Sequence, residues 1–476
     1  GRLRKDMGEA SIKTEEEFTR KKMDESMAQK PEMCEKNMAK GQLAIEMVSV
    51  KDGIAAAEKV AGEADAVLLF LGMNPMITCK EEIDRSHIRL PEYQQELLQK
   101  VCAVNKNVVV VLISSIPYDI SWAQEHAAGI LMCATGSMEL GNGLADIIFG
   151  KESPAGRLNM TWYHDSDMLP PITDYDIIRQ GRTYQYYDGK VLYPFGYGLT
   201  YSRLEYQKLS AKVYDYTTIR VSFEVKNVGE VTTDEVVQVY YKKMNPSVKR
   251  ANKTLVAFER IHAIKSGEVR RVDFEIPISD LRYYDVIEKE MLLEPGAYEI
   301  QVGASSEQIH LTEQLVLAGT ERGLRDGQRV QEAECFDMAK NHVLRKGHLG
   351  YTSVCSKNAT DMLQLTYEKM YLEKNAKQLV LDFWKEHPCH IWIEADGRVI
   401  GECQIGSLDQ EEERQLEAGQ ASGDGAFEAH QNWITRRREI GFAQQTVLLD
   451  NVPVQNEFTL TIRWQGMGKL CTYQFR

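Results

Sequence analysis

The sequence predicts a multidomain protein of mixed class, in which a parallel α/β layer is followed by two all-β sandwiches. Strands alternate with helices over residues 43–201, and short strands with in-and-out alternation occupy 202–318. A second strand-rich region fills 329–476. The chain has 476 residues, enough for about three domains of roughly 150 residues each. Its 43% hydrophobic and 27% charged residues are typical of a folded globular protein.

Net charge, apolar runs and cysteine usage bear on the partners and the cellular location of the protein. The net charge of −13 argues against nucleic acid or an anionic membrane as the main partner. No apolar run reaches the roughly 20 residues that a membrane-spanning helix needs. The nine cysteines are scattered, with no Cys-x-x-Cys pair, which favours reduced thiols in a cytoplasmic protein over disulfides in a secreted one.

Residues 1–42 predict a charged helical segment rather than a domain. They are rich in Lys, Glu and Met, and the run 15–22 carries opposite charges at helical spacing. Position 1 is Gly rather than Met, so we expect that the true N-terminus lies elsewhere.

Buried strands and helices alternate in the α/β region. Residues 66–71, 107–113 and 129–133 are continuous apolar runs, and 93–104 and 140–149 have helical periodicity. Such an alternation predicts a parallel sheet with right-handed crossovers.

The following regions read as β-sandwiches. Residues 219–225 and 235–241 alternate apolar and polar side chains within the predicted domain 202–318. Residues 319–328 are charged and Gly-bearing, which predicts a linker before the last domain, 329–476.

A cluster of carboxylates follows the first apolar strand of the α/β region. The run 79–85 reads Cys-Lys-Glu-Glu-Ile-Asp-Arg and comes after the strand 66–71. Open α/β sheets bind ligands at the carboxyl ends of their strands. The sequence therefore predicts a ligand-binding loop that offers an acidic group.

Four motif regions carry a specific resemblance. They are the loop with its continuation to Gln94, the run 136–161 containing Ser-Pro-Ala-Gly-Arg-Leu, the run 181–201 containing Gly-Arg-Thr-Tyr-Gln-Tyr-Tyr-Asp-Gly, and the strands between 227 and 299. In order and spacing, residues 50–318 resemble the C-terminal part of glycoside hydrolase family 3, the β-glucosidase and β-xylosidase group. The resemblance implies an α/β-sandwich domain followed by a fibronectin-III-like domain.

The resemblance also implies a retaining glycosidase mechanism, with a nucleophilic Asp on a barrel domain and an acid/base Glu on the α/β loop. By the family's spacing that Glu lies three residues before Asp84, which makes Glu81 the general acid/base candidate. Asp84 and Arg85 are expected to form an ion pair that shapes the loop.

This loop departs from the family pattern in three places. Lys80 and Glu82 stand where the family has Gly, and Ile83 stands where it has an aromatic residue. Lys80 would lower the pKa of Glu81 and Glu82 would raise it. Glu82 is therefore the rival for the acid/base role.

The 476 residues contain no eightfold β/α pattern, and the strand that usually opens the α/β domain is missing. We expect a barrel-bearing partner chain, or an N-terminal portion outside this sequence, to carry the nucleophilic Asp and to cover the exposed edge of the sheet. Cleavage of one precursor into two associated chains would also explain Gly1. The substrate implied is a β-linked oligosaccharide or glycoside, with no cofactor required.

The last domain resembles a family-6-like carbohydrate-binding module, a jelly-roll-like sandwich, more loosely. Residues 330–334 resemble its opening strand, and 458–462 with 470–475 resemble its closing pair. Such modules stack aromatic side chains on sugar rings, and Trp433 and Tyr351, in loop-like surroundings, are the candidates.

Three other tryptophans, Trp384, Trp392 and Trp464, lie in strand patterns, so we expect them in the core. Glu332 and Glu334 are candidate ligands for a structural Ca²⁺, although the acidic position expected near the C-terminus reads Cys471-Thr472.

Two further functions stay open. One is a non-catalytic carbohydrate-binding protein on a family 3 scaffold, and the other is a degenerate family 3 protein with a structural role.

Overall fold

The computed structural model describes residues 50–73, 85, 87–164, 167, 169–171, 176–346, 350–385, 388–406 and 442–476. The chain divides into two compact units, which are described separately. Unit 1 contains the described residues up to Asn245 together with Lys249–Pro277 and Ala297–Leu315. Unit 2 contains Pro246–Val248, Ile278–Gly296 and the described residues from Val316 onward. The predicted segment 1–42 lies outside the described residues.

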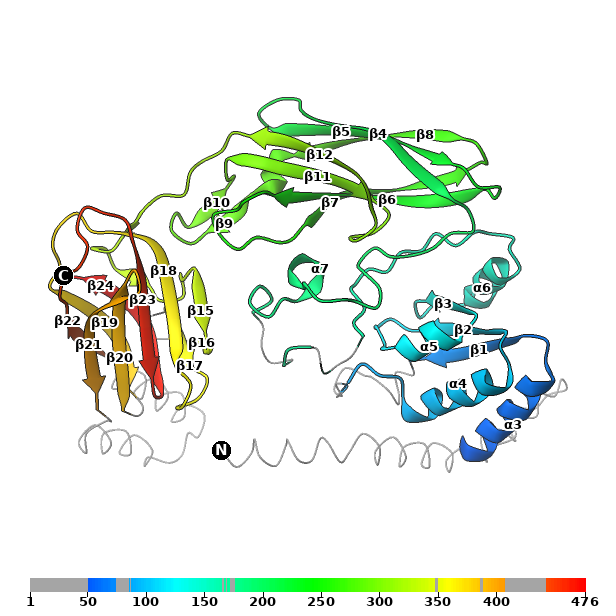
Figure 1. Ribbon diagram of the computed structural model, residues 1–476, viewed down its shortest axis with the longest axis horizontal. Coiled ribbons are helices and arrows are strands. Elements are labelled where there is room, and N and C mark those ends of the chain that lie inside the picture. Colours follow the sequence, from blue (N-terminus) through cyan, green and yellow to red (C-terminus); the bar gives the residue numbers. More distant parts are fainter. Residues whose placement is uncertain are drawn as a thin grey trace, which may run out of the picture. The chain divides into compact units, whose positions relative to one another are not determined.

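A parallel three-stranded sheet forms the α/β layer of unit 1 (Figure 1). Its strands are β1 (Val67–Gly72), β2 (Val108–Ile113) and β3 (Gly129–Cys133), in that spatial order. The central strand β2 reads Val-Val-Val-Val-Leu-Ile and is almost wholly buried, as expected for a parallel strand covered on both faces. The three predicted strands are confirmed.

The helices of this layer are α3 (Val50–Glu63), α4 (Glu92–Val104), α5 (Ser121–His126), α6 (Leu140–Ile148) and the short α7 (Thr183–Tyr186). The helical periodicity of 93–104 predicts one apolar face of Leu97, Leu98, Val101 and Cys102; helix α4 buries the last three, and Leu97 is half-buried. It also buries the polar side chain of Gln94. Among the described residues, no helix is both long and apolar enough to span a bilayer.

A seven-stranded β-sandwich follows in unit 1. One sheet contains β4 (Leu204–Val213), β5 (Thr218–Asn227) and β8 (Val269–Pro277), and the other has the order β12 (Ile309–Leu317), β11 (Gly296–Gly303), β6 (Thr233–Lys243), β7 (Thr254–Ile264). Along β5, Ile219, Val221, Phe223 and Val225 are buried and alternate with more exposed residues. The predicted period of two is confirmed for 219–225, whereas residues 237–241 of β6 are all buried and do not alternate.

Strand β6 is joined to the segment after α6 by buried polar contacts. Arg157 Nη2 donates to both carboxylate oxygens of Glu235, at 3.0 and 3.1 Å, and the two side chains are only 7% and 3% exposed. Tyr206 donates its hydroxyl to the same carboxylate at 3.1 Å. Ser153 and Thr233 share a hydrogen bond of 2.8 Å nearby. Buried hydrogen bonds and an ion pair therefore contribute to this junction.

We expect Glu235→Gln to lower the free energy of unfolding of unit 1 by about 3–5 kcal/mol, because it leaves the Arg157 guanidinium buried without a counter-ion. Hydrogen–deuterium exchange across β4 and β6 measures the change. Asp273→Asn, which breaks an exposed pair with Arg271, is the matched control and should have little effect. Equal effects of the two substitutions would contradict the prediction, whereas Arg157→Met combined with Glu235→Leu should recover most of the loss.

Unit 2 is a β-sandwich of two six-stranded sheets. The first contains β13 (Arg325–Asp326), β18 (Leu363–Tyr371), β23 (Phe458–Gln465), β20 (Cys389–Ala395) and β21 (Arg398–Ile405), with β15 (Met338–Lys340) beside β18. The second contains β16 (His342–Lys346), β17 (Thr352–Ser356), β24 (Gly468–Phe475), β19 (Gln378–Lys385) and β22 (Phe442–Leu448), with β14 (Gln331–Glu332) beside β24. One apolar core lies between them, with Leu379, Ile391 and Trp464 all fully buried.

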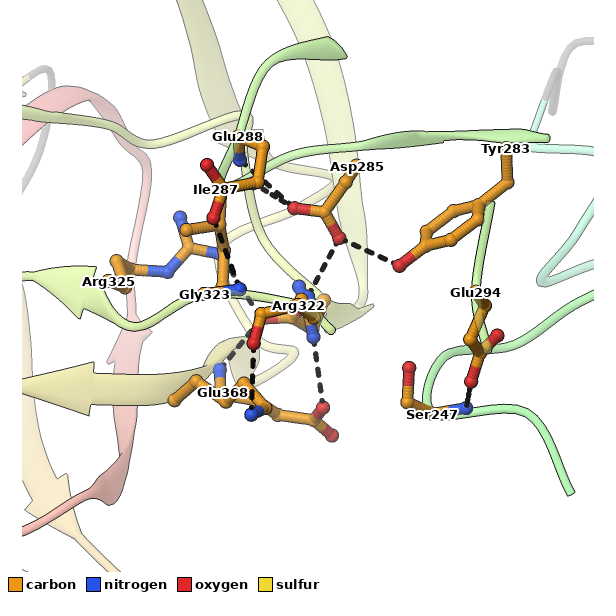
Figure 2. A network of polar contacts seen from close by, with 12 residues as sticks. Ser247, Tyr283, Asp285, Ile287, Glu288, Glu294, Arg322, Gly323, Arg325 and Glu368 are labelled. Atoms are coloured by element: carbon orange, nitrogen blue, oxygen red, sulfur yellow. Dashed lines mark hydrogen bonds and ion pairs between the residues drawn. The ribbon is translucent and has the colours of Figure 1, made fainter. Parts of the chain in front are cut away.

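Unit 2 also contains the segment 278–296, which in sequence falls inside the predicted second domain. It forms the short helix η2 (Ile278–Leu281) and a hairpin of β9 (Tyr283–Asp285) and β10 (Glu290–Leu292). Its anchor is Asp285, whose carboxylate accepts 2.8 Å hydrogen bonds from Arg322 Nε and from the Ile287 amide (Figure 2).

Arg322 is the centre of this buried network, with a side chain only 3% exposed. Besides Asp285 it contacts Asp337, and it forms a 3.4 Å ion pair with Glu368 of β18 (Figure 2). Arg325, 1% exposed, donates to Asp337 at 3.2 Å. Two arginines of the stretch 319–328, predicted as a linker, are therefore buried in unit 2, because three carboxylates compensate their charge there.

The pKa of Asp285 reflects two opposing influences. Burial alone would raise it, but hydrogen bonds from the Glu288 and Ile287 amides and the charge of Arg322 hold it below its usual value. Burial and the neighbouring carboxylate raise the pKa of Tyr283, which donates to Asp285, to about 12. A carboxyl group with a lowered folded-state pKa stabilises the fold above its unfolded-state pKa of about 3.9, and this stabilisation is lost as the pH falls.

We therefore expect Asp285→Asn to destabilise unit 2 by about 3 kcal/mol at pH 7, because it leaves Arg322 with less compensating charge. The difference from the parent protein should begin to shrink below about pH 4, and it should vanish only as the pH falls through the lowered folded-state pKa of Asp285. Hydrogen exchange across β18 and β23 at both pH values measures it. A difference that stays constant with pH would show that the Asp285 charge contributes nothing.

Candidate active site

The loop that carries the predicted catalytic carboxylates begins at the end of β1, where Gly72 is held on both sides. Gln94 of α4 accepts from the Gly72 amide and donates to its carbonyl, each at 2.9 Å. The φ angle of Gly72 is +135°, and a Cβ atom there would lie 2.0 Å from the carbonyl oxygen of Ile113. Only glycine fits this position, so the entry to the loop is fixed.

The far end of the loop is tethered to the segment that follows β2. Arg85 Nη1 donates to the carbonyl of Pro117 at 3.0 Å, and its guanidinium lies 4.9 Å from the ring centroid of Tyr118, which is 1% exposed. A little further on, the Asp119 amide donates to the carbonyl of Ile88 at 2.7 Å.

Both ends of the loop thus meet the carboxyl end of β2, since the Met73 amide also donates to the Ile113 carbonyl at 2.9 Å. Glu81, Glu82 and Asp84 lie outside the described residues. The expected partnership of Arg85 with Asp84 therefore stays a prediction, and the described contacts of Arg85 are with the segment after β2.

Two tyrosines of the 181–189 motif pack against neighbouring aromatic rings. Tyr184 stacks on Phe195, with ring centroids 4.4 Å apart, and accepts a hydrogen bond from the Leu255 amide. Tyr187 meets Tyr163 edge to face at 5.0 Å. Tyr184 and Tyr187 also line a cavity of about 150 Å³ together with Lys253, whose pKa is lowered by burial.

In unit 2 the aromatic candidates separate into buried and outward-facing groups. Tyr351 is half-buried against Trp384 and Cys471. Trp384 is 8% exposed and Trp464 is fully buried, as predicted. Trp392, also predicted in the core, is instead on the outer face of β20, because the neighbouring Ile391 and Ile393 point into the core. Trp433 lies outside the described residues.

The candidate calcium ligands do not form a cation site. Glu332 of β14 pairs with Thr472 of β24, so the two ends of the domain do meet as expected. However, the Glu332 carboxylate forms a 2.7 Å ion pair with Lys289, and Cys335 donates to it from 3.7 Å. Glu334 is half-buried nearby, and the described part of the chain contains no group of three or more His, Cys, Asp or Glu side chains suited to a metal. These residues do not fit Ca²⁺, which needs several oxygen ligands.

Comparison with known families finds the α/β domain and the fibronectin-III-like domain in the order that the motifs indicate. Residues 4–201 match the family model for the glycosyl hydrolase family 3 C-terminal domain, and residues 235–306 match the fibronectin type III-like domain. The resemblance inferred from the motifs is confirmed for these two parts of the chain. The carbohydrate-binding-module resemblance of the last domain stays a prediction.

Several relatives share these parts. The chain is 34% identical over 278 residues to a thermostable β-glucosidase B from Acetivibrio thermocellus, covering 56% of this chain and 36% of that protein. It is 37% identical over 262 residues to a β-xylosidase from Formosa agariphila, covering 54% of this chain and 36% of that protein. The crystal structure of a β-glucosidase from Kluyveromyces marxianus superposes with a TM-score of 0.54 at 30% identity, over 58% of this chain and 35% of that one. The chain thus spans about a third of the length of these relatives.

The loop anchors show what sequence reasoning could and could not find. Gln94 belongs to the first motif region, but nothing in its spacing indicated a clamp on Gly72. Tyr118 carries no motif, and its burial under Arg85 arises from the path of the chain after β2. Trp392 could have been placed, since it alternates with Ile391 and Ile393 and shares its face with His390 and Glu394.

We expect Gln94→Met to destabilise the α/β layer by about 2–4 kcal/mol, because it leaves the buried amide and carbonyl of Gly72 without partners. Hydrogen exchange of 67–73, compared between the parent and the variant, measures the effect. Gln99→Met, an exposed position on the same helix, is the matched control. Equal protection of β1 in all three proteins would show that the clamp is dispensable.

Proposed function

We propose that this chain is the acid/base-bearing part of a retaining, exo-acting β-glycosidase that hydrolyses terminal β-linked sugars. The observation that carries the proposal is the loop at the carboxyl edge of the sheet, whose entry is clamped to α4 by Gln94–Gly72 and whose two ends meet the exit of β2 through Met73–Ile113 and Arg85–Pro117. A loop fixed in this way can hold a carboxyl group at a defined place while remaining open to a substrate. The family match of residues 4–201 supports the same assignment.

In the proposed reaction, Glu81 protonates the glycosidic oxygen as the bond to the sugar breaks. It then removes a proton from the water that releases the sugar from the nucleophile. The nucleophilic carboxylate would lie about 5–5.5 Å from it, as retaining glycosidases require. Glu82 remains the rival for this role. The chemistry needs only the two carboxyl groups.

The nucleophile would come from a TIM-barrel part outside these 476 residues, either a partner chain or an N-terminal portion. Strand β1 supports this, because among the described residues it pairs on one side only, with β2. Leu68 and Phe70 of β1 are 45% and 53% exposed, which is unusual for apolar residues of a sheet that is otherwise covered. We propose that the barrel-bearing part supplies the strand that covers this edge.

The substrate class proposed is the β-glucoside or β-xyloside, because the relatives named above are a β-glucosidase and a β-xylosidase. For unit 2 we propose a jelly-roll-like, family-6-like carbohydrate-binding module, with Trp433 and Tyr351 as its first candidates. Its two six-stranded sheets and its paired chain ends support this. A non-catalytic carbohydrate-binding protein is the second candidate function. It would be favoured by sugar binding without hydrolysis when the barrel-bearing part is present.

With the barrel-bearing part present, Glu81→Ala should lower hydrolysis of glycosides with poor leaving groups by about 10²–10⁴-fold. Aryl glycosides with activated leaving groups should be cleaved much less slowly, because they need little protonation as they leave. Steady-state rates for one substrate of each kind measure the contrast.

Glu82→Ala is the matched comparison, because it removes the adjacent carboxylate. If the contrast appears only in this variant, the role belongs to Glu82. Equal loss for both substrate kinds in both variants would contradict an acid/base role for the loop.

A further inference from the structure

One tryptophan of unit 2 lies on a strand face that the core does not use. Along β20, Ile391 and Ile393 are fully buried, whereas His390, Trp392 and Glu394 alternate with them and are only partly buried. Side chains on one face of a strand share a direction, so Trp392 lies on the outer face of the first sheet.

The partners of Trp392 across the sheet are charged. It is directly opposite Glu402 on β21 and Arg463 on β23. Arg463 contacts Glu394, so its charge is compensated within the face. His390 Nε2 lies 3.3 Å from the Glu402 carboxylate. The surroundings of the indole therefore offer several hydrogen-bonding groups.

The indole ring is held in place on one side. His390 stacks on Trp392, with ring centroids 3.9 Å apart and an interplanar angle of 25°. Trp392 is itself only partly buried, and no hydrogen bond joins its indole N–H to another of the described residues. His390 is opposite Gln404 on one side and Gln465 on the other, and both are exposed.

We propose that this face, with Trp392 at its centre, binds a neutral glycan chain. A sugar ring has an apolar face that suits an aromatic ring and a rim of hydroxyls that suits amides and paired charges. An anionic ligand would need an unpaired cation beside the indole, whereas the arginine directly opposite Trp392, Arg463, contacts the carboxylate of Glu394. A bare apolar patch would instead fit a protein partner.

The inference rests on the proposed carbohydrate-binding role of unit 2 and deepens it. It assigns glycan binding to the sheet formed by β20, β21 and β23 in place of the loop candidates Trp433 and Tyr351. His390 acts here as a positioning residue, because its stacking fixes the orientation of the indole. Glycan bound on this face would keep a long substrate attached to the chain between cleavage events.

Affinity electrophoresis of the full 476-residue chain in gels containing soluble xylan or mixed-linkage β-glucan tests the proposal, with polygalacturonate as the anionic comparison. Trp392→Ala should weaken binding to the neutral glycan at least tenfold, as expected when a central aromatic anchor is removed. Trp392→Phe should retain part of the affinity. Tyr284→Ala, at an exposed aromatic position of the same unit, should change nothing.

The variants Trp433→Ala and Tyr351→Ala distinguish binding on this face from the broader proposal that unit 2 is a carbohydrate-binding module. If the chain binds glycan and either of these abolishes binding while Trp392→Ala does not, unit 2 is a carbohydrate-binding module but this face is not its site. Retention by polygalacturonate alone, or by no glycan, would overturn the assignment of the face to neutral glycans. If Trp392→Ala reduces the thermal stability of unit 2, Gln404→Ala on the same face provides the second measurement and should weaken binding without unfolding.

Discussion

The Arg157–Glu235 ion pair is the interaction on which the arrangement of unit 1 depends. It joins the segment after α6 to β6, the strand that holds both β7 and β11. Removing two charges from water costs several kilocalories per mole, and only close, multiple hydrogen bonds recover it. Such a contact tolerates little displacement, whereas an apolar contact can slide. The segment after α6 and the β-sandwich of unit 1 are thus held in one register by a contact that specifies position more than it adds stability.

Specific polar contacts also fix the position of the candidate site. The Met73–Ile113 and Arg85–Pro117 hydrogen bonds bring both ends of one loop to the exit of β2, and neither contact needs the carboxylates themselves. The sheet therefore fixes where the loop begins and ends. A loop built in this way can exchange its side chains without disturbing the layer beneath it, which is consistent with the departures from the family pattern at Lys80, Glu82 and Ile83.

Much of this could be predicted from the sequence, because hydrophobic period and motif order reflect local physics. The Val-rich run of β2 and the alternation of β5 indicate buried strands without any tertiary information. The linker prediction for 319–328 could not succeed in the same way, since Arg322 is buried only because Asp285, Asp337 and Glu368 come from elsewhere in the chain. Trp392 was misplaced for a different reason, because strand membership was considered and strand face was not.

The three separate stretches of unit 2 have a consequence for how the protein is made. A ribosome delivers the β9–β10 hairpin before β11 and β12, and all of these before the sandwich that Asp285 joins. The hairpin must therefore wait, outside its final partner, until Arg322 and the later strands have emerged. Such a domain cannot be exchanged between proteins as the residues from 329 onward alone. A recombination event at residue 329 would not transfer Arg322, on which the buried network of the domain is centred.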